Sequence, residues 1–115
     1  MLFRSNGIVG GGDLDPSDPN NARTAVSSDG GVTWTLTNPP PVTGAIFGLA
    51  YAHGAGNGSR TVVVTADTGG AAWTPDEGTT WFSLPGVNGF WAVAFASPKA
   101  GWLVGVNGQI LKISF

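Results

Sequence analysis

The stretches Ser27-Ser28-Asp29-Gly30-Gly31-Val32-Thr33-Trp34 and Thr74-Pro75-Asp76-Glu77-Gly78-Thr79-Thr80-Trp81 share one pattern, [Ser/Thr]-x-Asp-x-Gly-x-Thr-Trp, and begin 47 residues apart. A fixed period of this length is typical of repeat proteins, in which each repeat is one supersecondary unit. The matching positions are Ser27, Asp29, Gly31, Thr33 and Trp34 in the first copy and Thr74, Asp76, Gly78, Thr80 and Trp81 in the second. The pattern informs the fold more than the activity.

The composition favours an all-β protein. Only 10% of the 115 residues are charged, and long surface helices need many charged side chains. The chain has 19 Gly and 8 Pro between short apolar runs, which indicates many short strands joined by tight turns. Its length is enough for one small domain.

Charge and residue types exclude several functional classes. The net charge is −2 and the five basic residues are scattered, which argues against nucleic acid as a partner. The absence of Cys rules out disulfides and thiolate metal sites. No apolar run is long enough to span a membrane as a helix, so a membrane is not expected as a partner.

The repeat divides the chain into three expected units of antiparallel strands, at residues 1–37, 44–84 and 89–115. The central unit has the four strands and short turns of a β-propeller blade, and the other two are read as incomplete or interrupted copies of it. A polar insert at residues 12–22 interrupts the first unit, and the third lacks its outer strand. We expect strands at 1–4, 7–10, 23–27 and 33–37, at 44–52, 60–65, 71–74 and 80–84, and at 90–96, 101–106 and 109–114, with a hairpin turn at Asn107-Gly108.

About two and three-quarter blades cannot close a ring, because propellers close with about four to eight. The apolar faces of the end units need neighbours. Two arrangements remain open: the chain assembles with copies of itself, three giving about eight blades, or it is part of a longer propeller. In either arrangement an added strand could complete the last sheet at its edge.

The paired motifs resemble the Asp-box, or BNR repeat, of sialidase-type β-propellers. Residues 100–111, which read AGWLVGVNGQIL, also resemble the repeats of propellers similar to the photosystem II assembly factor. The resemblance implies that each Asp-box joins the third and fourth strands of a blade at its outer end. The physics agrees, because an Asp side chain can accept from nearby backbone N–H groups and the Trp ring can pack between strands. The resemblance also favours a secreted or periplasmic location.

No catalytic residue is assigned from the sequence. The resemblance implies that a sialidase would need three arginines, a Tyr–Glu nucleophile pair and an Asp, but here Glu77 lies in an Asp-box turn and Tyr51 in an apolar strand. Xyloglucan-cleaving glycosidases also carry Asp-boxes and use paired Asp residues, for which the free candidates are Asp13, Asp15, Asp18 and Asp67, although a turn is the simpler role of Asp67. His53 has no triad partner and is expected in a loop.

Other candidate ligand-binding residues are few. Asp13, Asp15 and Asp18 could supply oxygen ligands to Ca²⁺, although a solvated turn is the simpler interpretation and no cofactor is expected. Trp rings can stack on sugars, so Trp91 and Trp102 join Asp67 and His53 as candidate ligand-binding residues. For all five Trp the first expectation is packing in the core.

The favoured function is a non-enzymatic propeller scaffold that binds a protein or a glycan through its ring face and loops. Two alternatives stay open: a fragment of an Asp-box glycosidase of the sialidase or xyloglucanase type, and a self-assembling structural or engineered propeller fragment with no ligand. Fold alone does not choose among them.

Overall fold

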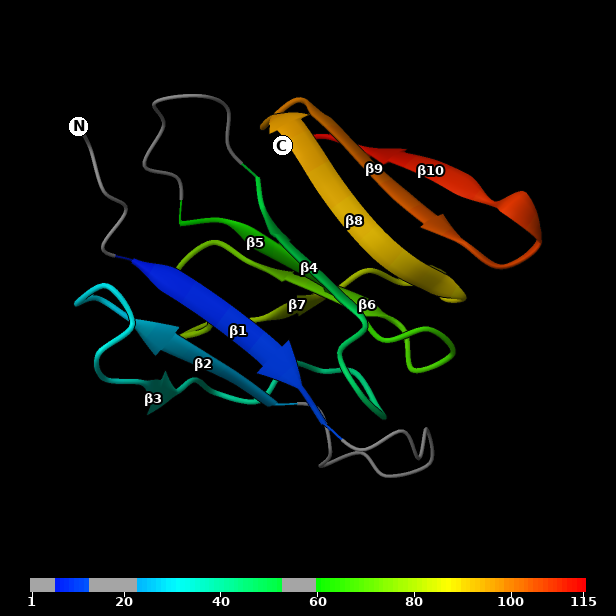
Figure 1. The fold of residues 1–115 in the computed structure, drawn as a ribbon. Coiled ribbons are helices and arrows are strands. Elements are labelled where there is room, and N and C mark those ends of the chain that lie inside the picture. The colour runs from blue at the N-terminus through cyan, green and yellow to red at the C-terminus, as the bar shows by residue number, and fades with distance from the viewer. Residues whose placement is uncertain (1–5, 13–22, 53–59) are drawn as a thin grey trace.

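The computed structural model describes residues 6–12, 23–52 and 60–115 (Figure 1). Within these residues the protein is all-β, with ten strands in three antiparallel sheets, none of them closed, and no α-helix. In the same residues no helix is long and apolar enough to cross a membrane. The all-β prediction is therefore confirmed.

The three sheets follow one another along the chain, and each is a simple meander. The first contains β1 (Gly7–Gly11), β2 (Arg23–Ser27) and β3 (Thr35–Leu36). The second contains β4 (Gly48–Tyr51), β5 (Val62–Thr65), β6 (Ala71–Thr74) and β7 (Phe82–Ser83). The third contains β8 (Phe90–Ser97), β9 (Ala100–Gly105) and β10 (Ile110–Ile113).

Most expected strands appear where the sequence pattern puts them, and β2 and β6 have the expected bounds. The strand expected at 44–52 was too long, because β4 begins only at Gly48. Gly44 has φ +75°, which bends the chain, and the Ile46 N–H donates to the carbonyl of Gly11 in the first sheet rather than within its own sheet. The strand expected at 1–4 lies outside the described residues.

The turn between β9 and β10 forms at the Asn-Gly pair, as expected. Asn107 and Gly108 have φ values of +56° and +70°, and the Gln109 N–H donates to the Val106 carbonyl at 3.1 Å. Positive φ at both central residues suits the right-handed twist of the flanking strands. This short turn includes one turn of 3₁₀-helix, Val106–Gly108.

The second sheet lies between the other two and is buried on both faces. In Figure 1, β1, β4 and β8 run side by side across the view, one from each sheet. Val62 and Val64 pack with Ile8 of the first sheet, whereas Val63 packs with Val93 and Leu103 of the third. Because side chains alternate along a strand, the run of valines in β5 supplies both cores.

Each sheet turns the same face toward the sheet that follows it. In the first sheet Val26 points toward the second sheet, and Trp73, 47 residues later, points from the second sheet toward the third. Their neighbours Ala25 and Ala72 point the opposite way, because adjacent strand residues alternate faces. We call the face that carries Val26 or Trp73 the forward face of its sheet, and the face that carries Ala25 or Ala72 the backward face. At both contacts inside the chain, the forward face of one sheet packs against the backward face of the next.

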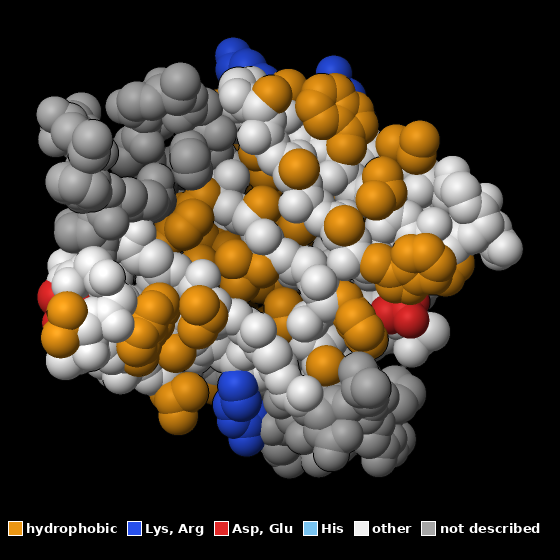
Figure 2. Space-filling model, in the orientation of Figure 1, with side chains coloured by type: hydrophobic (Ala, Val, Ile, Leu, Met, Phe, Trp, Pro, Cys, Tyr) orange, Lys and Arg blue, Asp and Glu red, His pale blue; other side chains and the backbone are white. Residues whose placement is uncertain are grey.

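The two outermost faces of the stack are largely apolar and are not covered by other described residues, although each carries one cation, Arg23 opposite Gly11 and Lys112 opposite Trp102. On the first sheet Val9 pairs with Ala25, which pairs with Leu36, and Val9 and Leu36 are exposed. On the third sheet the cross-strand pairs Ala94–Trp102 and Val104–Ile110 hold exposed Trp102, Val104 and Ile110. Figure 2 shows hydrophobic side chains along the strip that β8 and β9 occupy, and again over β1 and β2.

This arrangement corrects the expectation that every Trp packs in the core. Trp91 and Trp102 are 48% and 42% exposed, and Trp34 is 45% exposed, whereas Trp73 and Trp81 are half-buried against the two cores. Trp73 also stacks on Phe82, with ring centroids 4.9 Å apart. The exposed rings belong to the end sheets and their turns, which no further sheet covers among the residues that the structure describes.

Candidate functional site

The first motif folds as a tight turn held by its own side chains. The Ser27 hydroxyl accepts from the Gly31 N–H at 2.9 Å and donates to Asp29 Oδ1 at 2.8 Å. Asp29 in turn accepts from the Thr33 backbone N–H at 2.9 Å and from the Thr33 hydroxyl at 2.6 Å. The Asp carboxylate therefore closes the turn by accepting from the backbone, as predicted.

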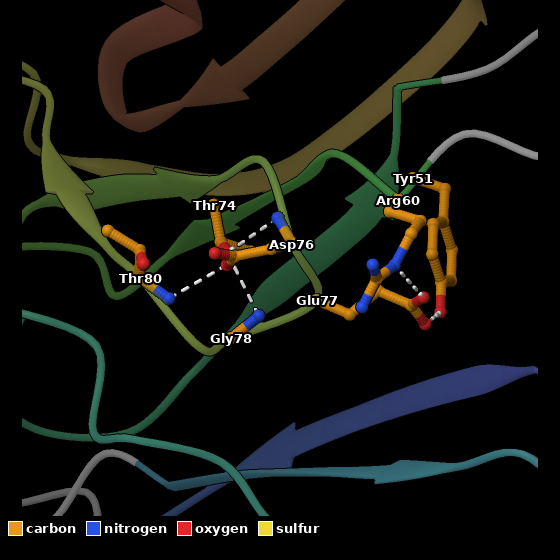
Figure 3. A network of polar contacts seen from close by, with 7 residues as sticks. All are labelled: Tyr51, Arg60, Thr74, Asp76, Glu77, Gly78 and Thr80. Carbon is orange, nitrogen blue, oxygen red and sulfur yellow. Dashed lines mark hydrogen bonds and ion pairs between the residues drawn. The ribbon is translucent and has the colours of Figure 1, made fainter.

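The second motif repeats this network. The Thr74 hydroxyl accepts from the Gly78 N–H at 2.9 Å and donates to Asp76 Oδ1 at 2.7 Å, and that oxygen accepts from the Thr80 N–H at 2.7 Å (Figure 3). Gly31 and Gly78 have φ values of +93° and +95°, a backbone conformation that favours glycine. The Asp takes the N–H of Thr33 or Thr80, and so β3 and β7 begin later than residues 33 and 80.

The hydrogen bonds lower the pKa of both turn carboxyls. The pKa of Asp29 falls from 3.8 to about 2, first because the Thr33 hydroxyl donates to the carboxylate and next because the Thr33 backbone N–H does. The pKa of Asp76 is also lowered, chiefly by the backbone N–H of Thr80. Both groups stay ionised near neutral pH, which suits a turn clasp and not a general acid.

A polar cleft of about 270 Å³ lies between the two turns, where the first sheet faces the second. The first sheet and its turn contribute four side chains with hydroxyl groups from the motif and its flank, together with Val26 and Asn6. The second contributes two carboxylates, a hydroxyl and a guanidinium. The lining residues are Asn6, Val26, Ser27, Ser28, Thr33, Thr35, Arg60, Asp76, Glu77 and Thr79. The repeat thus places two copies of one motif on opposite walls of a cleft.

Glu77 organises one wall of this cleft. Its carboxylate accepts from the Tyr51 hydroxyl at 2.7 Å and from Arg60 Nε at 3.1 Å (Figure 3). The Glu77 side chain is only 9% exposed, whereas that of Arg60 is 62% exposed. The Glu77 N–H also donates to the Arg60 carbonyl. The guanidinium is therefore anchored at its Nε while the rest of the group faces solvent.

Comparison with protein-family models, curated proteins and solved structures gave no match. The function therefore has to be argued from the residues and their geometry.

The structure separates the other candidate residues from the cleft. Asp67 lies in the β5–β6 turn with φ +52°, and its carbonyl accepts from the N–H groups of Gly70 and Gly89, which confirms its expected role in a turn. It does not line the cleft. Trp91 and Trp102 belong to the third sheet, away from the cleft. His53 and the calcium candidates Asp13, Asp15 and Asp18 lie outside the described residues, and the described residues contain no group of three metal-ligating side chains.

Sequence reasoning missed two features of this site. Tyr51 and Glu77 are 26 residues apart, and the sequence placed them in separate elements, yet the structure joins them through a hydrogen bond. Arg60 was noted only as a scattered cation. The available signal was positional: Tyr51 ends one strand, Arg60 starts the next, and antiparallel pairing brings Tyr51 opposite Val62.

Proposed function

We propose that this protein is a non-enzymatic scaffold of propeller-type blades that binds a neutral polyhydroxyl ligand, such as a sugar unit of a glycan, in the cleft between its two turn motifs. The observation that carries the proposal is the cleft itself, which is lined by hydroxyl, amide, carboxylate and guanidinium groups around a volume of about 270 Å³. Such a mixed set of donors and acceptors matches a sugar's hydroxyl groups.

The blade interpretation rests on the repeat. Two turns with the same hydrogen bonds, 47 residues apart, and three sheets stacked in one direction support the assignment of these sheets to an Asp-box propeller. Neighbouring blades of this kind place successive turns on the same side of the stack, which is where the cleft lies. The ligand site would therefore be a property of the repeat and not of one sheet.

The charges of the cleft favour a neutral ligand over an acidic one. Its lining holds one cation, Arg60, against the two carboxylates of Asp76 and Glu77, and Glu77 already pairs with Arg60. An anionic ligand would find no surplus of positive charge there. A sugar without a carboxylate needs no surplus of positive charge in the cleft.

Saturation-transfer NMR tests the proposal with neutral hexoses, N-acetylhexosamines and hexuronates as probes. We expect transfer to a neutral sugar, and a loss of at least about tenfold in affinity for Arg60→Gln, because one charged hydrogen bond to a ligand contributes about 1.5–3 kcal/mol. Lys99→Gln is the matched control, since it removes the same charge from the exposed β8–β9 turn. Equal binding by both variants, or binding of hexuronates alone, would contradict the proposal.

A glycosidase is the second candidate, favoured by the hydrogen bond between Tyr51 and Glu77. A carboxylate that accepts the phenolic proton is the arrangement needed to activate a Tyr nucleophile. Tyr51 is absent from the cleft lining, however, which favours a structural role for the pair. Hydrolysis of a chromogenic sialoside by the wild type, abolished in Tyr51→Phe with the fold intact, would replace the scaffold proposal.

A further inference from the structure

The outer face of the third sheet is built like a face that the protein covers elsewhere. The forward face of the second sheet presents Ala50, Val63 and Trp73, and the third sheet covers it. On the forward face of the third sheet the row Ala92–Val104–Ile110 has the same pattern, with a small residue on the first strand and larger apolar residues beyond it. The next row on this face is Ala94–Trp102–Lys112, which adds one cation to the surface. Here, within the described residues, nothing covers it, and Val104 is 43% exposed.

The opposite end of the stack carries the complementary surface. The backward face of the second sheet includes Val64 and Ala72, and it covers the first sheet. The corresponding face of the first sheet presents Val9, Ala25 and Leu36, and Leu36 is 68% exposed. Contiguous exposed apolar side chains on one sheet face are a feature of interaction sites, and this face also carries Arg23 at its edge. The stack therefore has a forward face exposed on the third sheet and a backward face exposed on the first sheet. Inside the chain, faces of these two kinds pack against each other.

We propose that a second copy of this chain docks head to tail, with the backward face of its first sheet (Val9, Ala25, Leu36) on the forward face of the third sheet (Ala94, Trp102, Val104, Ile110). The argument is continuity with the interfaces inside the chain, which join forward to backward faces twice in succession. An interface between unlike surfaces generates a ring when its rotation closes. Two copies would bring six sheets together, within the range in which propellers close.

The Trp side chains of the two turn motifs have different hydrogen-bond acceptors. Trp81 Nε1 of the second motif donates at 2.8 Å to the carbonyl of Asn38, in the segment that leaves the preceding sheet. Trp34 has no preceding sheet in the described residues, and its Nε1 donates to Gly31 of its own turn at 3.0 Å. This inference does not depend on what occupies the cleft.

Native mass spectrometry and sedimentation velocity test the contact. We expect the wild-type chain to form a dimer of the 11.7 kDa unit. Val104→Lys and Leu36→Lys each put a charge into one of the two apolar surfaces, and each is expected to weaken association at least about 100-fold, because an unpaired charge is costly to bury. Val32→Lys is the control, since Val32 is 81% exposed in the first turn and belongs to neither face.

Mixing the two face variants makes the test specific for head-to-tail docking. Each variant keeps one intact surface of the opposite kind, so an equimolar mixture of Val104→Lys and Leu36→Lys is expected to form a one-to-one dimer although neither associates alone. Self-association by either variant alone would indicate contact between like surfaces and overturn the proposal. A wild-type monomer at about 100 µM, where a micromolar interface would be saturated, would also overturn it.

Failure of this test and failure of the sugar-binding test are distinguishable. Circular dichroism of every variant establishes that the sheets remain folded, and the sugar titration can be repeated on Val104→Lys, whose substitution lies on the third sheet and outside the cleft. Retained sugar binding by a monomeric variant would show that ligand and self-association are independent. The self-association result therefore stands whether or not a sugar binds.

Discussion

The two turn motifs share the hydrogen bonds that join the Ser or Thr, the Asp and the backbone of the turn, but they differ in their surroundings. In the first, Asp29 and Gly31 are exposed, and Trp34 is 45% exposed. In the second, Gly78 is buried and Trp81 packs against the core between the first two sheets. Local sequence thus determines the turn, whereas the neighbouring sheet determines how far that turn is buried.

The segment after the first sheet makes this difference. Asn38 donates its backbone N–H to the Gly78 carbonyl at 3.1 Å and its side-chain amide to the Thr79 carbonyl at 2.7 Å, while its own carbonyl accepts from Trp81. These three hydrogen bonds join the segment after the first sheet to the turn of the second motif. The stability of the second turn therefore depends on the contact between repeats, whereas that of the first turn depends on its own hydrogen bonds.

Paired alanine substitutions at the turn glycines should give the largest difference. A methyl group at Gly78 would lie 2.6 Å from Cβ and Cγ2 of Thr37, whereas one at Gly31 would lie 3.6 Å from the ring of Trp34. Both pay about 1–2 kcal/mol for positive φ, and Gly78→Ala adds about 1–3 kcal/mol of overpacking. We expect losses near 3–4 and 1–2 kcal/mol, measured by urea unfolding.

The substitution Thr37→Ala, which shortens the side chain next to Gly78, serves as the control for that pair. Thr37→Ala removes Cγ2 and the hydroxyl but keeps Cβ, 2.6 Å from the added methyl group, so it relieves part of the contact, and Gly78→Ala should cost less in this background than in the wild type. Equal costs for Gly31→Ala and Gly78→Ala in the wild type would mean that the second turn is not clamped by the preceding repeat.

Removing the hydroxyl of Thr74 should cost more stability than removing that of Ser27, by a smaller margin than for the two glycines. Thr74→Val leaves the N–H of buried Gly78 without its acceptor, at a cost of about 2 kcal/mol, because an unsatisfied buried donor keeps its full desolvation penalty. Ser27→Ala frees the exposed Gly31 N–H, which water can reach, at about 0.5–1 kcal/mol. Denaturant unfolding monitored by circular dichroism measures both.

The reverse order would contradict the comparison. If Ser27→Ala cost more than Thr74→Val, the first turn would have to be the more enclosed of the two in solution. Dimerisation through the first sheet would produce that order, so the pair should be measured both below and above the concentration at which the chain associates.

Much of the fold could be predicted from the sequence because its signals are local. The Asp and Gly of each motif, the Asn107-Gly108 pair and the β-branched run at Val62 to Thr65 specify turns and a doubly buried strand through short-range chemistry. Their predicted positions are confirmed by the turns and by β5 and β10.

The candidate site was less predictable, because it depends on how separate elements meet. Nothing local to Tyr51, Arg60 or Glu77 indicates their contact, which requires both the β4–β5 pairing and the position of the second turn. The exposure of Trp34, Trp91 and Trp102 likewise depends on what lies beyond the end sheets. A sequence pattern identifies apolar faces but does not supply the surface that covers them.

The smallest expected effect is the pH dependence of the free energy of unfolding, which should reflect the protonation of Asp29 in the first turn. Because the pKa of Asp29 is lowered from 3.8 to about 2, the folded chain binds fewer protons there than the unfolded chain as the pH falls through this range. Its contribution is therefore complete above about pH 4 and is lost progressively toward pH 2. Asp29→Asn removes the titrating group, so the free energy of unfolding should depend less on pH between 4 and 2 than in the wild type. A carbon-detected NMR titration of the Asp29 carboxyl measures the pKa directly, and a value near 3.8 would mean that the Thr33 donors do not hold the carboxylate in solution. Asp76 should shift in the same direction, and its turn, clamped by Asn38, should keep its donors in place after the first turn has opened.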